Sequence, residues 1–445
     1  MTIVEFLSRG PATSRQIQAA LSLTQSAVSR RLRALGDRIV TLGRSRPPVY
    51  AATRNAFGGD DLLPLFMVDA NGDAVPVAMV RPLAHGGFLV MPTTGSPGVL
   101  AGIDGNGVYA DLPYFLQDLR PQGFLGRLLA RELAAVADEF PADPRRWTSN
   151  HIGRYLIAAG DDLPGNFKFG RQTRLRPRQR PAACAPADYP KLADQALSGQ
   201  TPASSAGGEQ PKFTAYSGDR GAHVIVKFSP TGDDAAARRW RDILITEFYA
   251  AEVLRAGRLP AADTRLLEQG GRLFLESIRF DRSGEHGRLP MISLQAVDAE
   301  FVGFGDGWGR VMRRLSEAGL VNFKHADDVE LLEHFGHLIN NSDMHLGNLS
   351  LGIEGDVFRL LPVYDMCSMG FAPTSAGVSP YRFTPPTITR SDFPRHTQAA
   401  RLHEMVEEFW GRVAADERIS GELRTFIAGR AADLGGYSSP QLRLI

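Results

Sequence analysis

The feature that most limits the folds open to this chain is the uneven distribution of its charge. Residues 1–58 contain nine arginines but only two acidic residues, Glu5 and Asp37, which gives this segment a formal charge of +7. The whole chain of 445 residues has a formal charge of +1, so the remaining residues together carry −6. Such an asymmetry predicts a small module that binds a polyanion, joined to a larger and mildly acidic body.

The basic segment has the hydrophobic pattern of a winged helix-turn-helix domain over residues 1–58. Three short helices are expected, with Ser14 and Thr24 as the N-caps of the second and third, followed by two strands that form the wing. A single domain of this kind covers little DNA, so tight and specific binding would require a homodimer that reads two half-sites. The side chains expected to contact DNA lie on the outer face of the third helix and in the wing: Gln25, Ser26, Ser29, Arg30, Arg33, Arg44 and Arg46.

The rest of the chain alternates between strand-rich and helix-rich segments. Residues 59–145 combine short β-like runs with glycine-rich turns and one amphipathic helix, which indicates a small β-rich subdomain. Residues 146–190 include an arginine- and proline-rich stretch, and we interpret them as a connector. Strand-like runs dominate 191–285 and helices dominate 286–445, so the predicted fold class is α+β with a two-lobed body.

The cysteines and the hydropathy of the chain indicate the cellular compartment in which the protein is expected. The two cysteines, Cys184 and Cys367, have a spacing that fits neither a disulfide framework nor a zinc site. No cationic and apolar leader begins the chain, and no apolar run approaches the roughly 20 residues that a membrane span requires. We therefore expect a cytoplasmic protein without a membrane partner.

The segment 204–212 has the composition of a phosphate-binding loop. Adjacent Gly207 and Gly208 let the backbone approach phosphate oxygens closely, while the hydroxyls of Ser204 and Ser205 and the ammonium of Lys212 suit anions. A flexible surface turn is the alternative interpretation.

An apolar strand then ends in Lys227, and a helix further along the chain carries Glu247. A strand lysine of this kind can reach into a cleft and pair with ATP phosphates, held by the helix carboxylate, as in protein kinases. A lysine at a sheet edge and a glutamate on a solvated helix face are the simpler alternatives.

Two acidic motifs follow in the helix-rich half. Asp343 and Asn348 have the D-x-x-x-x-N spacing of the kinase catalytic loop, in which the Asp accepts the substrate hydroxyl proton and the Asn binds Mg²⁺. Asp365 ends an apolar strand, where kinases carry their second metal ligand. Polar turns are the alternative for both. In order, the motifs match the parts that phosphoryl transfer from ATP needs: a phosphate cradle, a cation, a base and two metal ligands.

The motifs SSAGGEQPK, VIVKF, IRFDR, NNSDMHLGN and PVYDM together resemble the HipA family of serine/threonine kinases, the toxins of bacterial toxin–antitoxin systems. The resemblance spans roughly residues 60–440, and a winged helix on the same chain is similar to the YjjJ branch. It implies that Asp343 is the catalytic base, that Lys227 holds the ATP phosphates and that His345 lies beside them.

The resemblance also implies the remaining parts of the site. Asn348 and Asp365 would bind Mg²⁺. The adenine would meet the backbone at Ile278 and Phe280, with Asp281 near the ribose. The autophosphorylated serine of the family aligns with Ser205, and the adjacent Ser204 is a substitute for it. The known targets of the family are aminoacyl-tRNA synthetases, so a protein substrate from the translation machinery is implied.

Three functions stay open on the sequence. The first is a kinase toxin that inhibits translation and uses its own DNA-binding domain for autoregulation. The second is a transcription regulator whose kinase-like body only senses a nucleotide or another small effector. The third is a small-molecule phosphotransferase, which shares the D-x-x-x-x-N chemistry. The joint presence of a base, two metal ligands and a phosphate-binding lysine favours the first, because a protein that only binds a nucleotide needs no base.

Overall fold

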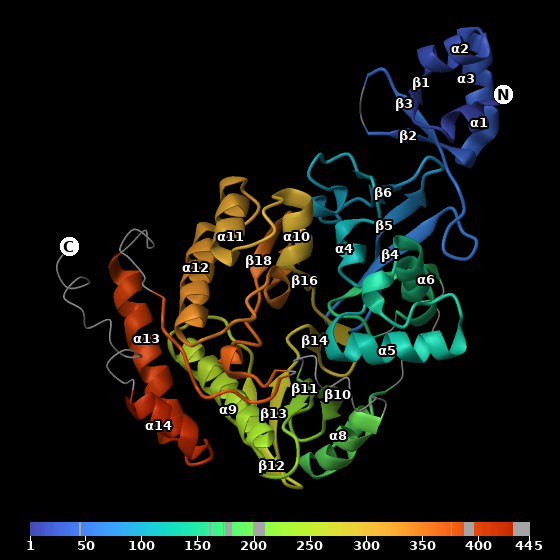
Figure 1. Cartoon of the computed structure of the whole chain (residues 1–445). Helices are drawn as coiled ribbons and strands as arrows, with labels where there is room; N and C mark the ends of the chain where they lie inside the picture. The colour runs from blue at the N-terminus through green and yellow to red at the C-terminus, as the bar shows by residue number, and fades with distance from the viewer. Residues whose placement is uncertain are drawn as a thin grey trace.

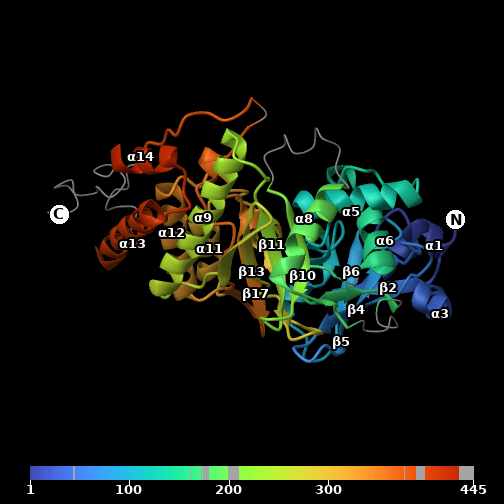
Figure 2. The same cartoon turned by 90° about the horizontal axis from the view of Figure 1, so that it is seen from below.

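Four parts of the chain are arranged in space largely in the order of the sequence. The computed structural model describes residues 1–43, 46–160, 162–171, 173, 180–198, 210–374, 376–386 and 396–429. The N-terminal domain projects from one corner of a middle domain, and the helix-rich lobe lies at the opposite side of the molecule (Figure 1). The view from below shows a strand-rich lobe between the middle domain and the C-terminal helices (Figure 2).

The N-terminal domain has the three helices and the two wing strands that the sequence predicts, and a short further strand, β1, joins the wing strands in a three-stranded sheet. Its helices are α1 (Ile3–Leu7), α2 (Ser14–Leu21) and α3 (Gln25–Leu35). Its strands pair in the order β1 (Ala12–Thr13), β3 (Val49–Ala52) and β2 (Ile39–Leu42). The apolar residues of the helices meet in one core, which includes Ile3, Leu7, Ile17 and Val28.

The caps of α2 and α3 explain where these helices begin. The hydroxyl of Thr24 accepts a hydrogen bond from the N–H of Ala27 at 3.3 Å and caps α3, as expected. The cap predicted for α2 is wrong by one residue. Thr13 takes that role because its hydroxyl accepts the N–H of Gln16, whose side-chain oxygen accepts the N–H of Thr13 in return. Ser14 is the first residue of the helix.

The middle domain is built on a five-stranded antiparallel sheet in the order β7-β6-β5-β4-β8. Its strands are β4 (Leu63–Val68), β5 (Ala74–Pro82), β6 (Phe88–Pro92), β7 (Val108–Tyr109) and β8 (Phe167–Phe169). The helices α4 (Tyr114–Gln117), α5 (Gly123–Val136) and α6 (Ser149–Ala159) complete it.

The prediction that residues 146–190 form a connector is wrong for much of that segment. Helix α6 packs beside α4, and β8 pairs with β4, with Phe167 opposite Met67. Strand β9 (Ala183–Cys184) already belongs to the next sheet. The sequence did not reveal β8 because three residues carry no periodicity and their partner strand lies far back in the chain.

The strand-rich lobe contains a second five-stranded sheet in the order β12-β13-β11-β10-β9. Its other strands are β10 (Lys212–Ser217), β11 (Ala222–Phe228), β12 (Thr264–Gln269) and β13 (Arg272–Ile278), and its helices are α8 (Tyr189–Ser198) and α9 (Ala235–Ala256). Beyond β13, the hairpin of β14 (Arg282–Ser283) and β15 (Gly287–Arg288) leads to the second lobe.

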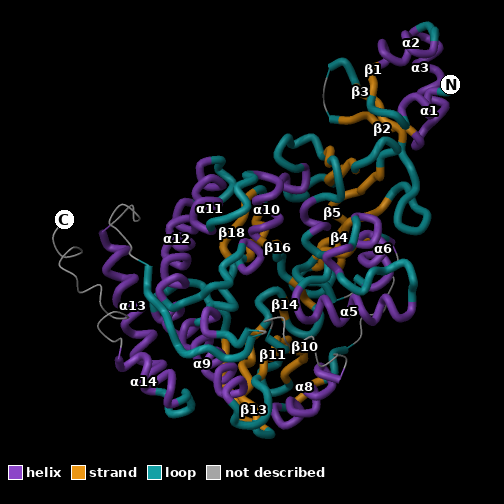
Figure 3. The backbone as a smooth tube through the Cα atoms, in the orientation of Figure 1, coloured by secondary structure: helices purple, strands orange, loops and turns teal. Residues whose placement is uncertain are grey.

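The second lobe is mainly helical, as predicted (Figure 3). It contains α10 (Leu294–Phe301), α11 (Trp308–Glu317), α12 (Phe323–Leu338), α13 (His396–Ala415) and α14 (Gly421–Gly429). A small sheet of β16 (Ile292–Ser293), β17 (Ser350–Glu354) and β18 (Val357–Leu360) lies between the helices. The predicted α+β class is thus confirmed. Among the described residues, no helix is long and apolar enough to cross a membrane.

Candidate active site

Lys227 and Glu247 form the ion pair that the sequence predicts. On β11, Val224, Val226 and Phe228 face the core beneath α8, so the alternation of the strand turns Lys227 to the other face. Its Nζ atom lies 2.5 and 2.6 Å from the two carboxylate oxygens of Glu247 on α9. Both side chains are buried.

Asp365 joins this pair from the other lobe. Its Oδ1 atom lies 2.7 Å from Nζ of Lys227, and its Oδ2 atom lies 4.0 Å from Nζ of Lys212. Burial alone would lower the pKa of Lys227, but Asp365 and Glu247 overcome that effect and hold the pKa above its usual range. Lys227 therefore stays charged at neutral pH.

The loop after α12 holds Asp343 beside this cluster. The side chain of Asp343 is 51% exposed, and its Oδ1 atom lies 3.8 Å from Nε2 of His345. Two asparagines fix its backbone: Asn341 accepts its N–H at 3.0 Å and Asn348 donates to its carbonyl at 2.7 Å. Asn341 also donates to the carbonyl of Asp365 at 3.3 Å, which ties the two segments together.

Sequence reasoning missed two residues that support this loop. The indole N–H of Trp308 donates to the carbonyl of His345 at 3.0 Å, and the hydroxyl of Tyr364 donates to the carbonyl of Gly347 at 3.2 Å. A signal was present for Tyr364, because a buried tyrosine usually finds a hydrogen-bond partner. Trp308 lies too far from the loop in sequence to be assigned to it.

Asp365 and Asn348 are the residues that could hold a magnesium ion. Asn348 uses its amide nitrogen on Asp343, and no described residue donates to its amide oxygen. Nowhere in the described ranges do three or more His, Cys, Asp or Glu side chains form a metal-binding group. Magnesium is commonly held by one or two protein ligands together with substrate phosphates, so this pair of oxygen donors fits it.

The three residues predicted near the base and ribose lie at the junction of the lobes. Ile278 ends β13 opposite Val224, and the ring of Phe280 packs 5.8 Å from that of Tyr364. A ribose contact for Asp281 is not supported by the structure. Its buried carboxylate is bound by the guanidinium groups of Arg279 and Arg282 and by the N–H of Gly165.

The remaining predicted residues divide into two groups. Those on α3, together with Arg46 of the wing, are exposed and so are accessible to DNA: Gln25, Ser26, Ser29, Arg30 and Arg33. Ser204, Ser205, Gly207, Gly208 and Arg44 lie outside the described residues.

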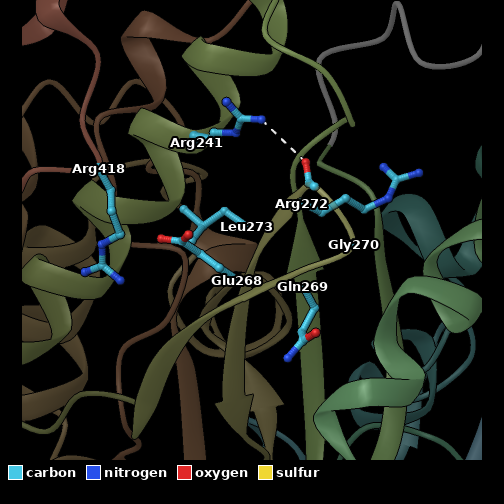
Figure 4. A pocket seen from close by; sticks show the side chains of 8 residues that line it. Arg241, Glu268, Gln269, Gly270, Arg272, Leu273 and Arg418 are labelled. Atoms are coloured by element: carbon cyan, nitrogen blue, oxygen red, sulfur yellow. Dashed lines mark hydrogen bonds between the residues drawn. The ribbon is translucent and has the colours of Figure 1, made fainter.

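A cavity of about 510 Å³ lies at the turn between β12 and β13, and none of the predicted site residues lines it. Arg241, Arg272 and Arg418 surround it (Figure 4). Each of the three is already paired with an acidic side chain: Asp233, Asp194 and Asp416 respectively. We therefore assign this cavity no part in the site.

Family models match three consecutive parts of the chain. Residues 1–38 match the arsR family of bacterial regulatory proteins, 59–177 the middle domain of YjjJ-like toxins and 204–417 the HipA-like C-terminal domain. Over 436 residues the chain is 37% identical to Toxin YjjJ of Escherichia coli strain K12, which covers 95% of this chain and 94% of that protein. The chain belongs to the YjjJ-like toxin family.

The YjjJ-like chain also shares its fold with a solved structure. A chain from the complex of HipA, HipB and operator DNA of Shewanella oneidensis MR-1 matches with a TM-score of 0.60 and 19% identity. The match covers 86% of this chain and 97% of that one. The YjjJ-like chain is thus a HipA-like toxin with an N-terminal helix-turn-helix domain of the DNA-binding type.

Proposed function

We propose that this toxin is an ATP- and Mg²⁺-dependent serine/threonine protein kinase. The observation that carries the proposal is the position of Asp365. Lys227 binds its carboxylate, while Asn341, from the loop that bears Asp343, binds its backbone carbonyl. The residues that we propose as phosphate cation, metal ligand and base therefore lie in segments that are bound to one another, and this arrangement supports phosphoryl transfer.

Each of these residues has a defined task in the proposed reaction. Asp343 takes the proton of the substrate hydroxyl, and its exposure makes it accessible to a protein substrate. Lys227, kept charged by two carboxylates, holds the nucleotide phosphates. When bound through Asp365 and Asn348, Mg²⁺ supplies charge neutralisation at the phosphate oxygens.

The wider role is proposed from the resemblance to the HipA family. In the proposed function the kinase phosphorylates a protein of translation, such as an aminoacyl-tRNA synthetase, and autophosphorylates at Ser205 or Ser204. The helix-turn-helix domain binds DNA as a homodimer for autoregulation, and the protein acts in the cytoplasm. The match to a regulatory-protein family over residues 1–38 supports the DNA-binding part.

A base substitution tests the enzymatic part directly. We expect Asp343→Asn to lower the rate of phosphoryl transfer by about 10²–10⁴-fold, because an amide cannot accept the hydroxyl proton. Nucleotide affinity should not change. Asp365→Ala should instead weaken binding of the Mg²⁺–nucleotide complex itself. The measurement is incubation with labelled ATP and Mg²⁺ followed by mapping of the phosphorylated residues.

Asp104→Asn is the matched control, because Asp104 is exposed on the middle domain. Transfer at the wild-type rate by Asp343→Asn would show that the base assignment is wrong. Nucleotide binding by the wild-type protein without transfer to any protein would favour the other candidate, a regulator that senses an effector.

A further inference from the structure

Gln210 is a buried polar residue to which the proposed reaction gives no task. The residue is only 4% exposed, yet neither Nε2 nor Oε1 of its amide has a hydrogen-bond partner among the described residues. Burial of an unpaired amide is unfavourable, and most buried polar side chains in proteins are paired. An exception of this kind requires an explanation, and a role in ligand binding is one.

The strand pairing shows how the backbone at Gln210 is placed. Lys212 lies opposite Lys227 in the β10–β11 pair. The N–H of Phe228 donates to the carbonyl of Pro211 at 3.3 Å, so the pairing continues one residue before β10 begins. Gln210 therefore enters the sheet in an extended conformation, immediately beside the strand that carries Lys227.

This placement sets the face on which Gln210 lies. Side chains alternate along an extended strand, so Gln210 shares a face with Lys212, two residues on. That face is directed at Asp365, because Nζ of Lys212 lies 4.0 Å from its Oδ2 atom. Phe213 faces the opposite way, into the core beneath α8. The Gln210 amide thus belongs to the same face as the candidate active site.

The register of the strands also indicates which part of the proposed nucleotide lies nearest to Gln210. Ile278, where the family resemblance implies that the adenine binds, lies level with Val224. Lys227 is three residues further along β11, which is about 10 Å at roughly 3.3 Å per residue. Continued pairing puts Gln210 level with Ser229, about 17 Å from the level of Ile278. Gln210 therefore lies past the lysine that holds the phosphates, on the side away from the adenine.

We propose that the amide of Gln210 donates a hydrogen bond to the terminal phosphate of a nucleoside triphosphate. The inference rests on the proposed function and adds a residue that distinguishes a triphosphate from a diphosphate. Lys212 and Lys227 already supply positive charge, and a neutral amide adds a directed bond without another charge. A diphosphate leaves the amide unpaired, and a site that leaves a buried polar group unpaired discriminates against that ligand.

The test compares two nucleotides on the full chain. Gln210→Leu should weaken binding of a non-hydrolysable ATP analogue with Mg²⁺ by about tenfold, and should change binding of ADP by less than about twofold. The melting temperature of the ligand-free protein should stay the same or rise, because leucine removes the unpaired amide without removing volume. Gln210→Glu should weaken the ATP analogue further, since a carboxylate repels phosphate.

Gln269→Leu is the control, because Gln269 is an exposed glutamine on β12 and should leave both affinities unchanged. Equal loss of both nucleotides together with a lower melting temperature would overturn the inference and make Gln210 a structural residue. Unchanged affinity for the analogue would also overturn it. If the wild-type protein binds neither nucleotide, the proposed function fails together with the inference. If it binds both but Gln210→Leu does not discriminate, only the inference fails.

Discussion

Asp365 adopts a backbone conformation that few residues other than glycine accept. Its φ angle is +55°, and Asn340, which follows the C-cap of α12, has a φ angle of +62°. The left-handed region costs most residues about 1–2 kcal/mol, although Asp and Asn tolerate it best. Such a conformation persists where neighbouring groups hold it. At Asp365 these are Lys227 on the carboxylate and Asn341 on the carbonyl.

The charge of Asp365 should stabilise the folded chain except at acid pH. Burial would raise the pKa of Asp365, but Lys227 and Lys212 overcome this and hold the pKa below its usual range. A carboxyl group with a lowered pKa in the folded state stabilises the fold above its unfolded pKa of about 3.9, and loses this contribution as the pH falls toward the folded value.

The corresponding variant is Asp365→Asn, which keeps the shape of the side chain but not its charge. We expect it to melt at a lower temperature than the wild type at pH 7, and the difference should shrink as the pH falls from about 5 to about 3. Circular dichroism melting curves of both proteins across this range provide the measurement. A difference that does not depend on pH would show that the carboxylate is not the stabilising group.

At the scale of elements, helix α9 links the candidate active site to the C-terminal part of the chain. One stripe of the helix carries Arg239, Asp242 and Thr246, and the next residue is Glu247. The Arg239 guanidinium stacks 3.6 Å from the ring centroid of Tyr381 and donates to two backbone carbonyls nearby. Asp242 accepts the hydroxyl of Tyr381 at 2.5 Å and also binds Ser420. The described residues of 371–382, which follow Asp365 in the chain, are thus bound to the helix that positions Glu247. We call this segment the strap.

Removal of this strap should destabilise the protein locally. Arg239→Ala loses a buried stacking contact and two charged hydrogen bonds, which together should cost about 2–4 kcal/mol. We expect Arg239→Ala to melt at a lower temperature than the wild type and to be cleaved faster near Arg382, which lies at the end of the strap. Arg239→Lys should be intermediate, because lysine keeps the charge but not the planar fork.

The neighbouring residue offers a matched control for this prediction. Arg238 is more exposed, and its partners among the described residues are the surface residues Asp233 and Glu422. Arg238→Ala should therefore change stability by less than about 1 kcal/mol. Equal effects of the two substitutions would argue against the strap as the source of the stabilisation.

At the scale of the whole molecule, the DNA-binding domain is packed on the body of the toxin. Leu42 and Ala51 of the wing share a small core with Leu83 and Leu89 of the middle domain. Buried Arg81 donates to the carbonyl of Asp37, in the turn that directly follows α3. The orientation of α3 relative to the middle domain is therefore set by these contacts.

DNA binding should depend strongly on salt, and two arginines should contribute differently. Arg46→Ala should weaken binding to all duplexes alike and reduce the slope of log affinity against log salt by about 1, as expected for a phosphate contact. Arg30→Ala should cost about 1–3 kcal/mol on the preferred duplex and relax sequence preference, as expected for a base contact. Fluorescence anisotropy with a duplex from upstream of the coding sequence and a scrambled duplex measures both. Binding that does not change with salt would contradict the prediction.

Local patterns in the sequence were sufficient to predict much of this protein. The helix-turn-helix domain follows from apolar spacing and from Thr24 as a cap, which are properties of a few consecutive residues. The pairing of Lys227 with Glu247 follows from a strand lysine and a helix close to it in the chain. The D-x-x-x-x-N loop and the aspartate after a strand are also short-range signals, so they could be read without a structure.

Contacts between distant segments were decided by the tertiary structure alone. The sequence did not show that β8 pairs with β4, that Lys212 approaches Asp365, or that Trp308 supports the loop after α12. The sequence also did not show that arginines bind the carboxylate of Asp281, or that the amide of Gln210 is buried without a hydrogen-bond partner among the described residues. The physical reason is that periodicity and capping report on neighbouring residues, whereas burial and hydrogen-bond partners depend on which distant segments the fold brings together.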